Sequence, residues 1–228
     1  MADNRGDAPE GGAFFDTHQR ATVEAAMARI IPTDDQPGAR EAATIEFLDR
    51  YLSGIDFIYA KPDGSGFEKL EGKRAQAWWQ RMGILREKYV KGIQELDRTS
   101  RDRFGADFAR LTEDQQDQVL AELEQPAREA EMDLEQARAV AGFAPVEPAL
   151  QQTSTETSME FVPLLAFHTR QGFYADPIYG GNKDRVGWQV IGFPGPESLA
   201  EVHAGRYSVL DWFADSRGYP GGEDEHGA

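Results

Sequence analysis

Residues 172–195, GFYADPIYGGNKDRVGWQVIGFPG, hold the side chains best suited to binding chemistry. Asp176 and Asp184 flank a Tyr-Gly-Gly-Asn turn, and five aromatic residues lie in the same segment. Aromatic rings beside Asp and Asn side chains could hold a sugar. The alternative is that Asp176 and Asn182 hydrogen-bond to the segment's own backbone and so shape a turn. We favour this structural interpretation over a carbohydrate site.

The same segment has no regular period. Strand-like alternation lasts only a few residues, and helical spacing fails across Pro177 and the Gly180-Gly181 pair. Glycine pairs occur where the backbone takes a positive φ or passes close to another group. Because a segment this rich in aromatic residues lacks the composition of a disordered region, we predict an ordered aromatic and glycine-rich loop whose large side chains cover a surface.

Motifs for cofactor binding and catalysis are absent from the sequence. It contains no GxGxxG turn, no GxxxxGK[ST] loop, no HExxH helix and no GxSxG elbow. It has no cysteine, which excludes thiolate metal sites, iron–sulfur clusters and CxxCH haem attachment within these residues. The four histidines lack ligand-like spacing, and for His168 a packed or exposed side chain is favoured over a catalyst. We therefore predict no catalytic residue, no cofactor-binding residue and no metal ligand in this chain.

Asp34 and Asp35 form a second acidic group, in the turn Ile-Pro-Thr-Asp-Asp-Gln-Pro-Gly. The two carboxylates could bind a cation. Carboxylates that precede a helix more commonly accept hydrogen bonds from its free N–H groups and face the positive end of its dipole. We therefore favour helix capping over cation binding.

Composition sets the broad class of the protein. The 228 residues carry a formal net charge of −16, and the 40% that are hydrophobic are enough for a globular core. An acidic protein repels phosphate backbones and anionic lipid headgroups, so we predict no nucleic-acid partner. No run approaches the roughly 18 apolar residues of a spanning helix, so we predict no direct membrane insertion.

The elements expected around the loop are helices, and we predict a mainly α fold: a single domain of helices with long irregular loops. Its parts are a flexible N-terminal tail (1–15), a helical domain (16–212) and a polar C-terminal tail (213–228). Residues 55–72 show no period and predict an irregular excursion with a short hairpin at Asp63-Gly64.

Capping boxes and apolar stripes predict the individual helices. Asp16 and Gln19 begin a first helix, and Ile45, Leu48 and Leu52 give the buried stripe of a second, so that the two form an antiparallel hairpin.

Further helices are expected over 74–99, from the capping box of Thr112 and Gln115, over 126–140 as a solvated helix, and over 196–203. Thr157 and Glu160 form a third capping box, for the helix that leads into the loop. Pro163 should kink that helix, because proline removes one backbone hydrogen bond.

Three segments of the sequence resemble the gluconate 2-dehydrogenase subunit 3 family. In the loop, Y-G-G-N is preceded by G-F-Y-A-D-P and followed by V-G-W-x-x-I-G-F-P-G. The second segment is A-R-I-I-P-T-D-D-Q-P-G-A-R-E-A (28–42), and a weaker third is F-G-A-D-F-A-R-L-T (104–112). The three span most of the chain in the family's order.

The resemblance implies a small, non-catalytic accessory subunit of a flavin-dependent sugar or polyol dehydrogenase. In such complexes the large partner is of the glucose–methanol–choline oxidoreductase type and binds FAD, and a multihaem cytochrome c often completes the complex. The chain would then bind and stabilise the FAD subunit while carrying no cofactor itself, with haem c in a third subunit.

The surface expected to contact that partner is the aromatic loop, because Tyr, Trp and Phe dominate interface energetics. The predicted interface consists of Phe173, Tyr174, Asp176, Pro177, Tyr179, Gly180, Gly181, Asn182, Trp188 and Phe193.

The sequence leaves more than one possibility open for the cellular location and for the function class. The first residues lack the basic start and apolar core of a signal peptide, which favours the cytoplasm, whereas the resemblance implies the periplasm if the chain is exported with its partner. Two other function classes stay open: a stand-alone carbohydrate-binding or carbohydrate-active protein that uses residues 172–195, and a generic helical scaffold.

Overall fold

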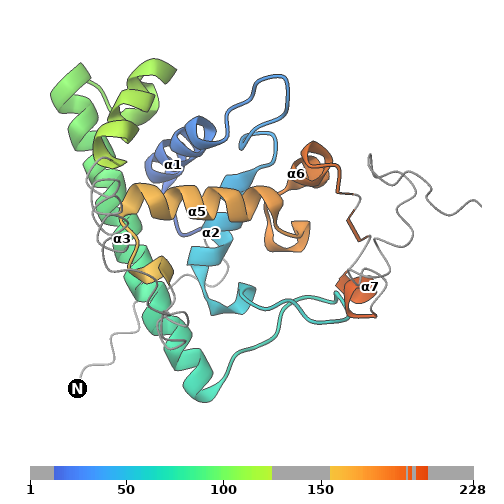
Figure 1. Ribbon diagram of the computed structural model, residues 1–228. Coiled ribbons are helices and arrows are strands. Elements are labelled where there is room, and N and C mark those ends of the chain that lie inside the picture. The colour runs from blue at the N-terminus through green and yellow to red at the C-terminus, as the bar shows by residue number, and fades with distance from the viewer. Residues whose placement is uncertain (1–12, 125–154, 194, 197–198, 205–228) are drawn as a thin grey trace, which may run out of the picture.

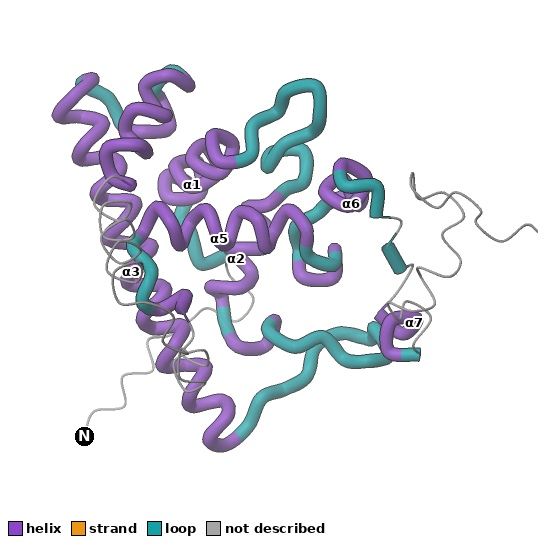
Figure 2. Tube along the Cα trace, in the orientation of Figure 1, coloured by secondary structure: helices purple, strands orange, loops and turns teal. Residues whose placement is uncertain are grey.

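The computed structural model describes residues 13–124, 155–193, 195–196 and 199–204. Within these ranges the regular structure is helical, apart from one antiparallel bridge between Ala60 and Phe67 (Figure 2). The predicted mainly α, single-domain fold is therefore confirmed. None of the described helices is both long and apolar enough to cross a bilayer.

The described α-helices are α1 (Thr17–Ile30), α2 (Thr44–Ser53), α3 (Gly72–Phe104), a helix described over 113–124, α5 (Phe161–Tyr174), α6 (Val186–Val190) and α7 (Leu199–His203). Short 3-10 turns lie between them: η1 (Ile55–Phe57), η2 (Phe108–Arg110), η4 (Thr155–Thr157), η5 (Pro177–Tyr179) and η6 (Lys183–Arg185). Figure 1 shows α5 across the middle of the molecule, with α3 along one side and α7 on the other.

The first two helices form as their sequences predict. Asp16 accepts a hydrogen bond from the backbone N–H of Gln19 at 2.8 Å, and the Gln19 side chain accepts one from Asp16 at 3.1 Å, which completes the capping box. In α2, Ile45, Leu48 and Leu52 are buried, as their helical spacing requires. The helices α1 and α2 pack against each other and against α5.

Phe15, the last residue of the predicted tail, belongs to the core. Its side chain is buried, and its backbone N–H donates to the carboxylate of Asp49 at 2.9 Å. The ordered domain therefore begins slightly earlier than predicted. Residues 1–12 of that tail and the predicted C-terminal tail, 213–228, lie outside the described residues.

The long helix α3 extends beyond the predicted range of 74–99 at both ends. The sequence predicts a buried stripe of Trp78, Met82, Leu85, Tyr89, Ile93 and Leu96; the last five are buried, whereas Trp78 is only half-buried. The next helix begins after the predicted capping box, in which Thr112 donates to the Gln115 side chain at 3.0 Å and accepts from Gln115 at 3.4 Å. The predicted solvated helix over 126–140 lies outside the described residues.

The start of α5 corrects two predictions. The capping box of Thr157 and Glu160 is wrong, because Thr157 ends η4 and Glu160 is an N-cap whose side chain makes no capping bond. Since α5 begins at Phe161, Pro163 lies in its first turn, where a backbone N–H has no partner within the helix. Pro163 therefore breaks no hydrogen bond of α5, and the reason for predicting a kink there does not apply. The predicted last helix is also shorter, because α7 begins only at Leu199.

The central helix α5 contacts α1, α2 and α3. It approaches α2 closely at Gly172, where an added Cβ would lie 2.8 Å from Cγ2 of Thr44 and 3.0 Å from Cβ of Phe47. Any side chain at Gly172 would push the two helices apart. This contact fixes the spacing of α2 and α5, which form two walls of the candidate site.

Candidate functional site

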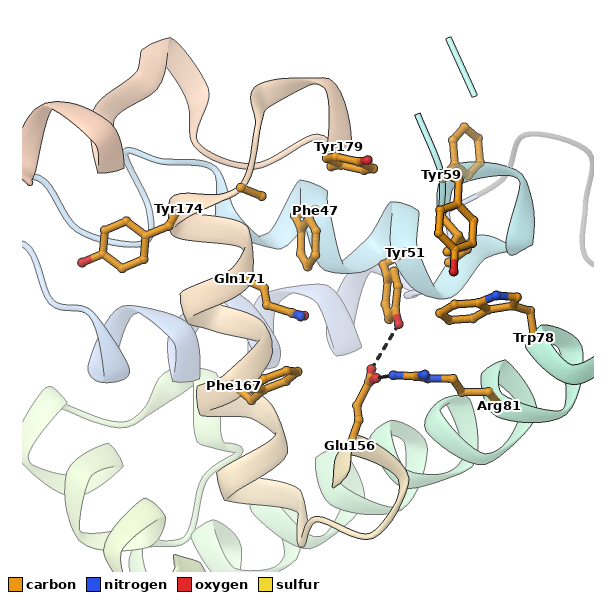
Figure 3. A pocket seen from close by; sticks show the side chains of 13 residues that line it. Phe47, Tyr51, Tyr59, Trp78, Arg81, Glu156, Phe167, Gln171, Tyr174 and Tyr179 are labelled. Carbon is orange, nitrogen blue, oxygen red and sulfur yellow. Dashed lines mark hydrogen bonds and ion pairs between the residues drawn. The ribbon is translucent and has the colours of Figure 1, made fainter. Parts of the chain in front are cut away.

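A pocket of about 550 Å³ opens where α2, α3 and α5 meet the turns around η1 and η5 (Figure 3). Eight aromatic side chains line it: Phe47, Tyr51, Phe57, Tyr59, Trp78, Phe167, Tyr174 and Tyr179. The remaining lining residues are Ile58, Arg81, Glu156, Gln171 and Ala175. A concave, largely aromatic surface with a few polar groups is typical of binding sites.

Helical spacing builds the walls that α2 and α5 contribute. Phe47 and Tyr51 lie four residues apart on α2, and their rings stack with centroids 5.8 Å apart and planes inclined by 7°. On α5, Phe167, Gln171 and Tyr174 share one face, because their spacing follows the helical repeat. Figure 3 shows the Gln171 side chain between the rings of Phe47 and Phe167.

The irregular segment between α2 and α3 forms a further wall. The ring of Tyr59 meets that of Trp78 edge to face, with centroids 5.8 Å apart. The predicted short hairpin is present as the bridge of Ala60 with Phe67. This hairpin packs on η5. The rings of Phe67 and Tyr179 meet edge to face with centroids 5.7 Å apart, and the Tyr179 hydroxyl accepts a hydrogen bond from the N–H of Ala60 at 3.3 Å.

The floor of the pocket is a buried network around the carboxylate of Glu156. Glu156 is only 3% exposed, and it accepts hydrogen bonds from the Arg81 guanidinium and, at 3.2 Å, from the Tyr51 hydroxyl. Figure 3 shows both interactions. Its Oε1 also lies 2.6 Å from Nε2 of His168. The opposite charges of Arg81 and Glu156 compensate each other, so the floor carries no net charge.

His168 is a packed residue beneath this floor. It is fully buried, and its Nδ1 lies 2.7 Å from the Tyr89 hydroxyl. Burial and, to a smaller extent, the nearby charge of Arg81 together lower the pKa of His168 to about 3, so the imidazole is neutral at pH 7. A neutral imidazole has one donor and one acceptor, so Nε2 donates to Glu156 while the Tyr89 hydroxyl donates to Nδ1. The packed interpretation of His168 is confirmed.

The predicted aromatic loop is ordered, but it is a series of short turns and helices rather than one irregular loop. Helix α5 continues through Tyr174, and η5, η6 and α6 follow it. Gly180 has a φ of +113°, and an added Cβ at Gly181 would lie 2.1 Å from the carbonyl oxygen of Gly172. The glycine pair thus meets both predicted needs: one residue takes a positive φ, and the other allows a close backbone approach.

The polar residues of this segment bond to its own backbone. The carboxylate of Asp176 accepts from the N–H of Ile178 at 2.9 Å. The amide of Asn182 donates to the carbonyl of Ala175 at 2.9 Å and accepts from the N–H of Gly187 at 2.8 Å. The structural interpretation of Asp176 and Asn182 is therefore confirmed, and neither residue lines the pocket.

The predicted interface residues fall into three groups in the structure. Tyr174 and Tyr179 line the pocket. The chain itself buries Phe173, Gly181, Asn182 and Trp188. Half-buried positions outside the pocket lining are occupied by Asp176, Pro177, Gly180 and Phe193. Contact of these residues with a partner stays a prediction.

Trp188 closes the end of this segment. Its side chain is 6% exposed, its indole N–H donates to the carbonyl of Tyr174 at 2.8 Å, and its ring packs edge to face on Phe193. The tryptophan therefore joins α6 to the end of α5.

The pocket residues outside 172–195 were not predicted as site residues from the sequence. Phe47 and Tyr51 carried a usable signal, because they lie four residues apart on a face of α2 different from that of Ile45 and Leu48. No sequence pattern marks Glu156 as a pocket residue, because its partners Tyr51 and Arg81 are distant in sequence.

Asp34 and Asp35 do not cap a helix, contrary to the prediction. Asp34 accepts from a backbone N–H two residues later, at 2.8 Å, and so closes a local turn. The helix that follows, α2, has Ala43 as its N-cap, with no side-chain capping bond.

Comparison with known proteins adds one match. A family model described as gluconate 2-dehydrogenase subunit 3 matches residues 17–195, and the matched segment contains every residue that lines the pocket. No curated protein and no solved structure matches the chain.

Proposed function

Since the chain belongs to the gluconate 2-dehydrogenase subunit 3 family, we propose that it is a non-catalytic small subunit that binds and stabilises an FAD-containing catalytic subunit. That partner is expected to be of the glucose–methanol–choline oxidoreductase type and to oxidise a sugar, a glucoside or gluconate. A cytochrome c subunit that carries haem c would complete the complex. The observation that carries the proposal is the family match, which covers the described chain from α1 to α6.

The described side chains support a role without catalysis. His168 is neutral and fully buried, so it cannot reach a substrate. The carboxylate of Glu156 is already paired with Arg81. A general base must lie within hydrogen-bond reach of the proton that it removes, and these groups are held by one another instead.

The carbohydrate alternative loses the residues on which it depended. Asp176 and Asn182 bind backbone groups of their own segment, so their placement serves the segment's own turns and not a ligand in the pocket, which neither residue lines.

Affinity purification of the tagged chain from its native host tests the proposal. We expect a flavoprotein dehydrogenase to co-purify in a fixed ratio, with flavin absorbance in the complex and none in the isolated chain. When the catalytic subunit is produced alone, it should be less soluble or contain less flavin, because an obligate interface leaves an apolar patch exposed. A catalytic subunit that is fully soluble and fully flavinated alone, and that does not bind the chain, would contradict the proposal.

A further inference from the structure

We propose that the aromatic pocket is the docking site for an uncharged, apolar or aromatic side chain of the catalytic subunit, carried on a segment with acidic neighbours. This inference rests on the proposed function and specifies which surface performs it.

The floor of the pocket determines the charge of the group that enters. Arg81 and Glu156 face the pocket as a compensated pair, and Tyr51 donates to the same carboxylate. A charged group placed on this floor would lose its hydration without gaining a free counter-ion, which is costly. The deeper part of the pocket therefore suits an uncharged group.

The walls of the pocket determine which kind of uncharged group fits. Stacked Phe47 and Tyr51 face the pocket from α2, and Tyr59 with Trp78 faces it from the other side. Tyr174, at the pocket's lining, is 41% exposed, so aromatic surface also continues towards solvent. Buried aromatic anchors that fill such concavities supply most of the binding energy at protein interfaces.

Two arginines lie against lining rings at the rim of the pocket, although the whole chain has a net charge of −16. The guanidinium of Arg50 lies 5.6 Å from the centre of the Phe57 ring, and that of Arg74 lies 4.4 Å from the centre of the Tyr59 ring. Arg50 donates to a backbone carbonyl, and among the described residues no carboxylate pairs with it. Arg74 forms a long ion pair, at 4.0 Å, with exposed Glu68. Charge complementarity therefore favours acidic residues beside the anchor.

A protein side chain fits this lining better than a free sugar does. Sugar recognition needs several hydrogen bonds, but Tyr51 and a terminal nitrogen of Arg81 already bind Glu156, and Tyr179 binds the backbone of the hairpin. Of this group, the buried Nε–H of Arg81 lacks a hydrogen-bond partner among the described residues.

Gln171 is the polar side chain that Figure 3 shows among the rings. Beside this amide, the hydroxyls of Tyr59 and Tyr174 and the Nε–H of Arg81 are polar groups of the lining without a hydrogen-bond partner in the described part of the chain. Eight aromatic rings outweigh these few groups, which favours an apolar anchor over a polyhydroxylated ligand.

Filling the pocket tests the inference. Gln171 is exposed at the pocket wall, so Gln171→Trp should occupy the pocket without disturbing the core. We expect the purified variant to bind the catalytic subunit roughly thirtyfold more weakly, with unchanged Tm and helicity. Gln94→Trp, at an exposed position of α3 outside the pocket lining, is the matched control and should bind normally.

Reversing one rim charge gives an independent measurement. Arg74→Glu should slow association with the catalytic subunit at low salt, and the difference from wild type should shrink as salt is raised. Arg110→Glu, at an exposed position of η2, is the control and should change neither the association rate nor its salt dependence.

The outcomes separate the two proposals. If wild type forms no complex, the proposed function and this inference both fail. If wild type forms the complex and Gln171→Trp binds equally tightly, the function stands and the pocket assignment is overturned. Calorimetric binding of glucose or gluconate to the wild-type chain that Gln171→Trp abolishes, with complex formation intact, would identify a carbohydrate pocket and also overturn the inference.

Discussion

Nε2 of His168 lies 2.6 Å from the carboxylate of Glu156, directly beneath the aromatic pocket. The other ring nitrogen bonds to Tyr89 of α3 at 2.7 Å. One buried imidazole therefore connects η4, α3 and α5, three elements that all contribute to the pocket or its support. The network thus holds together the elements that carry the pocket residues.

Folding stability should fall as the pH drops below 6.5, because of His168. Its pKa is about 3 in the folded chain and 6.5 as the ordinary value. Between these values the unfolded chain binds a proton that the folded chain does not, so stability rises with pH through this window and is fully present above it. Urea denaturation should give an unfolding free energy about 2 kcal/mol lower at pH 5 than at pH 7.5.

The variant His168→Gln is the control for this pH dependence, because it keeps a polar side chain but cannot titrate. Its unfolding free energy should change less over the same range. Identical pH dependence in the two proteins would show that other groups, such as the carboxylates, cause the effect.

Local patterns were predictable from the sequence, and long-range contacts were not. The capping box of Asp16 with Gln19 involves residues three apart, so the sequence alone contains both partners. The floor of the pocket joins Glu156 to Tyr51, 105 residues away, and to Arg81, 75 residues away. No periodicity connects residues at such separations, so their pairing needs the folded structure.

The start of α5 was predicted incorrectly for the same reason: it depends on a long-range contact. Thr157 and Glu160 satisfy the local pattern of a capping box as well as Asp16 and Gln19 do. In the folded chain, however, Glu156 enters the pocket floor and binds Arg81, and the residues around it form η4. A tertiary contact therefore displaced the helix start that local sequence favoured.

Trp188→Ala should destabilise this chain rather than its complex. The indole is 6% exposed and donates to Tyr174, so truncation leaves a cavity and an unpaired carbonyl. We expect a loss of about 3 kcal/mol, seen as a lower Tm, with near-normal affinity of the folded fraction for the catalytic subunit. Trp188→Phe, which keeps a ring but loses the N–H, should lose only about 1 kcal/mol. Weakened binding with an unchanged Tm would instead place Trp188 in the interface.

Gly181→Ala should destabilise the chain for a steric reason. Positive φ belongs to the neighbouring Gly180, whereas at Gly181 an added Cβ would lie 2.1 Å from a backbone oxygen that cannot move away independently. We expect a loss of roughly 1–3 kcal/mol. Gly83→Ala is the matched control, since a Cβ there would meet no atom within 4 Å outside its chain neighbours and the adjoining backbone of α3. It should stabilise α3 by about 0.5–1 kcal/mol. Thermal denaturation of both variants measures these opposite signs.

Glu156→Gln should cost more stability than removal of the whole ion pair. The substitution leaves Arg81 partly buried without its counter-charge, and breaking such a pair costs roughly 3 kcal/mol. The double variant Arg81→Met/Glu156→Gln removes both charges, so its loss should be smaller than that of Glu156→Gln alone. Chemical denaturation of wild type, both single variants and the double variant completes the cycle. If the stability losses of the two single variants add up to that of the double variant, Arg81 and Glu156 are not coupled. That result would contradict a pocket floor built on their ion pair.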